Sequence, residues 1–355
     1  QPLADPGELV GSSLIALLAK LSGSTVNAFI LADLIFPPLV FLILFRLIKL
    51  WLKSDIQAVA GGLAILVGYH YLTYFPYLPA VLKLFLSYWQ KGDYWQFIRS
   101  FHPQISLGLF LLFAIRLWPK AKTKWHLTSI LLIFLTYTHF FYWTAALSWL
   151  VWMGINRRLV KILTVWIVAT IPYWWQVGNL SQATDFWQRN YFYQPPTLNQ
   201  WLVLLLGMLL STSKFWRRFY AAAFTLVIAA MLLRFGADDP IGHWFLRVVN
   251  PMTAILLVVT IFKKIRLPKA LWLGLSLLLL TFQWRLHSQY FKNNAAAFMI
   301  EPERLEAFSW LKDNTPKNSI VAASMKDSLY LPAYTNNQPY LKLSQLSWAD
   351  DQELR

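Results

Sequence analysis

A cluster of ionisable residues occupies the stretch DDPIGHWFLRVVNP, residues 238 to 251, between two strongly apolar segments. It contains Asp238, Asp239, His243 and Arg247. A guanidinium binds phosphate or carboxylate oxygens through two parallel hydrogen bonds, and an imidazole donates or accepts one. The cluster therefore predicts a site for an anionic substrate, with Asp238 and Asp239 holding Arg247 when the site is empty. The alternative is that these acids and Arg247 only pair with one another at a membrane edge.

Two further stretches carry the same residue types. RSFHP, residues 99 to 103, contains Arg99 and His102, and YTHFFYW, residues 137 to 143, contains His139. Arg99 and His102 end an amphipathic segment, residues 74 to 104, whose spacing predicts a helix lying in the membrane interface. We expect Arg99 and His102 to face an anionic headgroup, and the turn at 137–143 to lift His139 towards the same outer side. The alternatives are a segment that only anchors the chain and histidines that only pack.

The chain is too apolar for an ordinary soluble protein. Of its 355 residues, 57% are hydrophobic and only 14% are charged, whereas soluble domains carry roughly 25% charged residues. The absence of cysteine excludes disulfides and thiolate metal sites. The composition predicts an all-α polytopic membrane bundle.

Membrane-spanning helices must therefore position the candidate residues. A bilayer core about 30 Å thick needs roughly 20 apolar residues per helix. The segment from Trp125 to Asn156 is too long for one crossing, roughly 48 Å as a straight helix, and basic residues flank both of its ends. We therefore predict a short helical hairpin with its turn at residues 137 to 143. The other predicted spans, which bring the total to about nine or ten helices, are 29–52, 56–75, 103–118, 162–176, 198–212, 219–234, 251–263 and 268–284.

Clusters of basic residues occupy every second connection between these spans. The positive-inside rule places five clusters in the cytoplasm, with Asp55 as the one acid among them. The clusters are Arg46, Lys49 and Lys53; Arg116, Lys120, Lys122 and Lys124; Arg157, Arg158 and Lys161; Lys214, Arg217 and Arg218; and Lys263, Lys264, Arg266 and Lys269. The net charge of +16 thus reports topology and gives no reason to expect a nucleic acid partner. The candidate residues, together with a loop at 177–198, then share the outer face, where they can converge.

The two ends of the chain differ in character. The charge alternation places residues 1–27 outside, so we expect a preceding span to be missing from a membrane domain at 1–294. Residues 295–355 form a separate, outer-facing segment. Its run EPERLEAFSWLKDNTPKNSIVAAS predicts a helix, a stop at Pro316 and a short strand. We expect the start of a small α/β domain, which either caps the membrane domain or binds substrate.

The order of these features resembles the GT-C superfamily of integral membrane glycosyltransferases. Those enzymes take a sugar from a polyprenyl phosphate or pyrophosphate lipid at the outer leaflet. The resemblance implies a membrane enzyme, in the plasma membrane of a bacterium or archaeon, that uses a lipid-linked sugar as donor among membrane lipids. The matching pieces are LIALLAKLSGSTVNAFILADLIFPPLVFLILFRLIK, IRSFHPQISLGLFLLF, FLTYTHFFYWTAALSWLV, DPIGHWFLRVVNP and RLEAFSWLKDNTPKNSIVAAS.

The resemblance also implies roles for the site residues. The family's first outer loop carries an acid that takes the acceptor's proton or binds a divalent metal. Here that loop corresponds to QPLADPGELVGS, so the role passes to Asp5 and Glu8. Arg247 and Arg99 are the expected phosphate ligands. The remaining candidates, which would orient sugar or phosphate, are His102, His139 and His243.

Two other classes of protein fit the same composition. A transporter or flippase for a lipid-linked or anionic substrate would line a path at the midplane with acids, but only Asp33 lies inside a predicted span. We expect Asp33 to cap a helix or pair locally. A noncatalytic scaffold predicts that the outer polar groups stay apart. Convergence of Arg99, His139 and Arg247 in one cavity would favour the enzyme.

Overall fold

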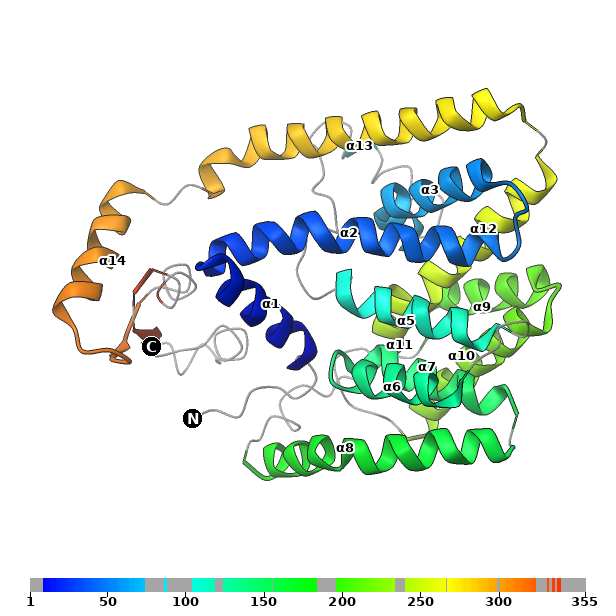
Figure 1. Cartoon of the computed structure of the whole chain (residues 1–355), viewed down its shortest axis with the longest axis horizontal. Helices are drawn as coiled ribbons and strands as arrows, with labels where there is room; N and C mark the ends of the chain where they lie inside the picture. The colour runs from blue at the N-terminus through cyan, green and yellow to red at the C-terminus, as the bar shows by residue number, and fades with distance from the viewer. Residues whose placement is uncertain are drawn as a thin grey trace. The chain divides into compact units, whose positions relative to one another are not determined.

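The computed structural model is almost entirely helical in the part of the chain that it describes (Figure 1). That part comprises residues 9–73, 86–87, 104–118, 124–154, 156–183, 196–233, 240–265, 267–298, 301–323, 331, 334–335 and 337–339. The chain divides into two compact units, Gln1–Tyr290 and Phe291–Arg355. The predicted interfacial helix at 74–104 lies outside the described residues, apart from 86–87 and Gln104.

The first unit contains helices that correspond to the predicted spans, plus α1 and the short helices α11 and η4, which were not predicted; residues 240–249, expected in an outer loop, continue directly into α12. The helix α8 also continues to Ala183, so the loop predicted from residue 177 begins later. The elements are α1 (Leu9–Ser22), α2 (Thr25–Lys49), α3 (Asp55–Thr73), α5 (Gln104–Leu117), α6 (Trp125–Thr136), α7 (Phe140–Trp152), α8 (Arg157–Ala183), α9 (Leu198–Leu210), α10 (Lys214–Leu233), α11 (Pro240–Trp244), the π-helical η4 (Phe245–Val249), α12 (Asn250–Lys264) and α13 (Lys269–Phe298), which runs into the second unit.

Three stretches of the described residues are helical, long and apolar enough to cross a membrane. They are Asn27–Lys49, Lys214–Leu232 and Ile241–Lys264. Large apolar side chains also face outward, among them Val168 and Trp175 of α8, which are 62% and 73% exposed. A soluble protein rarely exposes such side chains in continuous stripes. The described part of the chain thus has the helices and the exposed apolar surface that fit a helical membrane protein.

The helices of the first unit pack side by side. Contacts join α2 to α5, α5 to α6 and α6 to α8, and Figure 1 shows these helices as neighbours. In addition, α7 packs against α10 and η4, and α12 packs against α3. At the α1–α2 corner Gly23 has φ +73°, a left-handed conformation that glycine adopts at little cost. This corner lets Ile15 of α1 pack against Ala28 and Ala32 of α2.

Basic residues gather at one end of this bundle. In Figure 1 the C-termini of α2 and α12 and the N-termini of α8 and α13 lie together on the right. Lys49, Lys264, Arg157 and Lys269 belong to these helix ends. We call this the basic end. The opposite end, where α6 stops before His139, is called the His139 end.

The segment at 125–156 is broken into two helices, as predicted. α6 ends at Thr136 and α7 begins at Phe140, and the two helices contact each other. The Tyr137 and His139 N–H groups donate to the Ile133 and Leu135 carbonyls, which closes the last turn of α6. The charges that flank the segment therefore lie at the same end of two antiparallel helices.

We predict that both ends of this hairpin lie on one side of the membrane. Because the chain has no cysteine, single cysteines at the exposed Lys124 and Asn156 report their side directly. An impermeant thiol reagent added from outside should spare both and label a cysteine at the exposed Asn199, the second residue of α9, at the His139 end. Labelling of Lys124→Cys without Asn156→Cys would contradict the hairpin.

A close helix contact anchors α9 to α10. A Cβ placed on Gly207 of α9 would lie 2.0 Å from the ring of Tyr220. Tyr220 is fully buried, and its hydroxyl donates to Thr253 Oγ1 of α12 at 2.8 Å. Gly207 is thus the residue that allows α9, α10 and α12 to meet at this point.

The second unit holds less regular structure than the expected α/β domain. Its described residues form helix α14 (Pro302–Asn314) and two short strands, β1 (Ile320–Val321) and β2 (Gln338–Pro339), which pair in parallel. The Phe308 ring stacks on that of Tyr334, with centroids 5.9 Å apart. The predicted helix, turn and strand are present, but a folded α/β domain is not shown.

Candidate functional site

Arg247 and His139 meet at the His139 end. The Arg247 Nη1 atom lies 2.8 Å from His139 Nε2, although 108 residues separate them. Both side chains are half-buried. The guanidinium carbon also lies 6.0 Å from the centroid of the Phe141 ring. Two of the predicted site residues are therefore in direct contact.

Two of the contacts of His139 make conflicting demands on its ring. His139 caps α7 by accepting the Phe141 N–H at Nδ1, 3.3 Å away, so a neutral ring carries its proton on Nε2. That Nε2–H then faces Arg247, whose guanidinium has only donors. If Nε2 instead accepts from Arg247, Nδ1 holds the proton and the cap is lost. An anionic oxygen that accepts from both groups would remove the conflict.

Arg247 has one more hydrogen-bond donor, its Nε–H group. Its Nε atom is buried and makes no hydrogen bond. A buried guanidinium N–H without an acceptor costs free energy. A ligand with several acceptor oxygens, such as a phosphate, can bind Nε and Nη together in the forked geometry that guanidinium favours.

Aromatic rings surround the pair. The His243 ring stacks on Phe141, with centroids 5.0 Å apart and planes 27° apart, so the third predicted residue also belongs to this cluster. The Trp244 ring meets Phe141 edge-on, and its Nε1–H donates to Thr144 Oγ1 at 2.8 Å. Phe141 and Thr144 are the residues that our sequence reasoning missed. The position of Phe141 two residues after His139 was the available signal.

A widened helical turn directs Arg247. Residues Phe245–Val249 form a π-helix between α11 and α12, and the Asn250 N–H donates to the Phe245 carbonyl, five residues back. Phe245, Val248 and Val249 are buried, while Arg247 on the same turn reaches His139. Single π-helical turns occur often at functional sites because they shift a side chain out of the α-helical repeat.

Two other contacts lie toward the same end. The Val10 N–H of α1 donates to the Tyr137 carbonyl at 3.0 Å, which ties the first described helix to the turn before His139. Gln104 at the start of α5 donates through Nε2 to Asp33 Oδ1 at 2.8 Å. We expected Asp33 to cap or pair locally; it pairs with a different helix instead.

The remaining predicted site residues lie outside the described residues. They are Asp5, Glu8, Arg99, His102, Asp238 and Asp239. Within the described part of the chain no group of three or more histidine, aspartate or glutamate residues is placed to hold a metal ion. The acids that were expected to take a proton or bind a metal are not among those residues, so their roles stay predictions.

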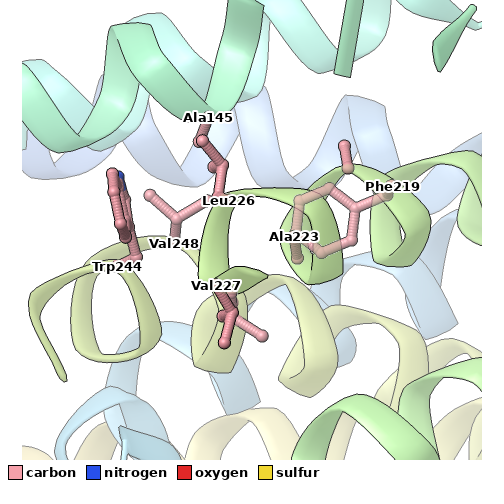
Figure 2. A pocket seen from close by; sticks show the side chains of 9 residues that line it. Ala145, Phe219, Ala223, Leu226, Val227, Trp244 and Val248 are labelled. Atoms are coloured by element: carbon pink, nitrogen blue, oxygen red, sulfur yellow. The ribbon is translucent and has the colours of Figure 1, made fainter. Parts of the chain in front are cut away.

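A small cavity beside the site is a packing gap. Figure 2 shows it between α7, α10 and the α11–η4 turn, near Ala145, Ala223 and Trp244. Its volume is about 10 Å³ and its lining is apolar. A space of this size holds about one water molecule and offers it no hydrogen bond. This cavity therefore offers no group that could bind an anionic substrate.

No protein-family model, no curated protein and no solved structure matches this chain. The functional argument accordingly rests on the geometry of the site itself.

Proposed function

We propose that this protein transfers a sugar from a polyprenyl-phosphate donor to an acceptor on the non-cytoplasmic face of the membrane, in the manner of a GT-C glycosyltransferase. The observation that carries the proposal is the contact between Arg247 and His139. The Arg247 Nη1 atom lies 2.8 Å from His139 Nε2, and the buried Arg247 Nε makes no hydrogen bond, at the end of the bundle opposite to the basic residues. The phosphate of a lipid-linked sugar supplies the missing oxygens.

The proposed reaction assigns the groups simple roles. The acceptor oxygen bonds to the anomeric carbon while the bond from that carbon to the phosphate oxygen breaks. The phosphate leaves with the electron pair, and the acceptor proton passes to a carboxylate, for which Asp5 and Glu8 are the candidates. Arg247 and His139 stabilise the charge that builds up on the leaving phosphate. We assign the orientation of the sugar to His243, whose ring stacks on Phe141.

The proposed topology fits this donor. We infer a bundle of about nine or ten crossings with its basic end in the cytoplasm, in which Arg247, near the start of the candidate span Ile241–Lys264, faces the outer leaflet. The apolar faces of helices such as α8 then lie in lipid, where a polyprenyl chain dissolves. The segment after α13 is expected on the same outer side.

The test measures both binding and consumption of the donor. The purified protein should bind a polyprenyl-phosphate sugar at least about tenfold more tightly than the corresponding polyprenol, since the phosphate contacts are charge-assisted. Membranes that contain the protein should release polyprenyl phosphate from the labelled donor, whichever acceptor receives the sugar. Equal binding of donor and polyprenol would refute the proposal.

A flippase is the alternative that this test separates. In proteoliposomes a flippase moves the intact donor between leaflets, so an impermeant reagent gains access to the sugar while the donor is not consumed. The enzyme consumes the donor, and the access of the reagent to the remaining donor does not rise. If the donor moved between leaflets without release of polyprenyl phosphate, the protein would be a flippase and not a transferase.

A further inference from the structure

A second polar pocket lies at the basic end, far along the helices from Arg247. It has a volume of about 510 Å³ and opens where α6 and α8 begin. Four of its six lining residues are cations, and none of the six is an acid. The lining consists of Lys124, Trp125, His126, Arg157, Arg158 and Lys161.

Packing of α6 against α8 brings these cations together. The two helices start at the same end and contact each other along their lengths. Like charges this close repel, and the positive ends of two helix dipoles add to the repulsion. The N-terminus of α8 already has its own cap, because Asn156 Oδ1 accepts from the Arg158 and Leu159 N–H groups at 3.0 Å each. The pocket's preference for an anion therefore comes from its side chains.

The neighbouring basic cluster is arranged differently. There Lys49 pairs with Asp55 at 2.6 Å, so the protein supplies its own counter-charge. At the α6–α8 pocket the lining supplies none. An anion from outside the chain would lower the electrostatic energy of this pocket most.

Apolar surface continues from the pocket along both helices. On α6 the exposed stripe runs from His126 to Ile130 and Phe134, which are 44% and 47% exposed. On α8 it runs from Lys161 to Val168 at four- and three-residue steps. A ligand that fills both regions needs an anionic head and an apolar tail.

We propose that the α6–α8 pocket binds the headgroup of an anionic phospholipid of the leaflet at the basic end, with the acyl chains along the apolar stripes. Basic pockets between transmembrane helices on the cytoplasmic side suit phosphate headgroups. The Lys161 ammonium lies 6.0 Å from the centroid of the Trp125 ring, and tryptophan is enriched at membrane interfaces, which suits this ligand. The binding is independent of the proposed transfer reaction at the other end.

The test uses the full chain in detergent and native mass spectrometry of bound lipid. Phosphatidylglycerol should be retained about tenfold more than phosphatidylcholine with the same acyl chains, since charge is the main difference. The variant Lys124→Gln, Arg157→Gln, Lys161→Gln should lose about tenfold of this retention, because each cation contributes near the surface. All three side chains are exposed, so the core is unaffected.

A matched variant controls for overall charge. Lys263→Gln, Lys264→Gln, Lys269→Gln removes three exposed cations from another basic cluster and should retain phosphatidylglycerol within about twofold of the original chain. If both variants lost phosphatidylglycerol equally, the retention would depend on the net charge of the protein and not on the α6–α8 pocket, and the proposal would be wrong. Glycerol phosphate that displaces the lipid at equal concentration would show a site for soluble phosphoesters and overturn the lipid as ligand.

Discussion

Replacing Arg247 with alanine is expected to weaken binding of a polyprenyl-phosphate sugar by about 100-fold and to abolish transfer. Two charge-assisted hydrogen bonds to phosphate, at roughly 1.5 kcal/mol or more each, account for this loss. The donor affinity of Arg247→Lys should lie between that of the original chain and that of Arg247→Ala, because an ammonium keeps the charge but lacks the planar fork. Donor binding is measured by titration of the purified protein, and folding by thermal unfolding in detergent.

A second arginine provides the control for this prediction. Arg217 is exposed near the start of α10, at the basic end, so Arg217→Ala should leave donor binding within about twofold of the original. If Arg247→Ala binds the donor as well as Arg217→Ala does, Arg247 is not a phosphate ligand. The phosphate role would then pass to Arg99.

Gly207→Ala is expected to be the most damaging small substitution in the bundle. The added methyl would lie 2.0 Å from the Tyr220 ring, and that ring is enclosed by the core and held through Thr253. Overpacking of this kind costs about 1–3 kcal/mol or more, because a buried ring can move only if its helix moves. Thermal unfolding in detergent should show a transition lowered by several degrees, of the order expected for such a loss.

Gly274→Ala is the matched control, since nothing lies within 4 Å of a Cβ at that position of α13. It should leave the transition unchanged or raise it slightly, because alanine favours a helix by about 1 kcal/mol over glycine. The cost of Gly207→Ala should also shrink in a Tyr220→Leu background, where the ring is gone. An undiminished cost there would show that the close contact is not its cause.

The helical architecture could be predicted because the lengths of the apolar segments and the positions of the charges between them can be read directly from the sequence. The break at 137–139 followed from a segment too long for one crossing with basic residues at both ends. Helix α1 was missed, since charge counting located residues 1–27 on a side but said nothing of their conformation. The extension of α8 to Ala183 was missed because its polar last turns resemble a loop.

The contacts within the site could be predicted only in part. Charge placed His139 and Arg247 at the same end, but their 2.8 Å contact depends on which helices become neighbours. The same limit explains Asp33, whose partner Gln104 lies 71 residues away on α5. Hydropathy indicates how deep a residue lies in the membrane. It does not indicate which helix lies beside it.

The π-helical turn at Phe245–Val249 has a consequence for how this protein can change over time. Its widened spacing accommodates one more residue than an α-helical turn, as an insertion absorbed by a helix would. The helix before it and the helix after it therefore keep separate rotational registers. Substitutions that alter the packing of α12 therefore need not change the direction of Arg247, so the helix core and the polar site can diverge independently.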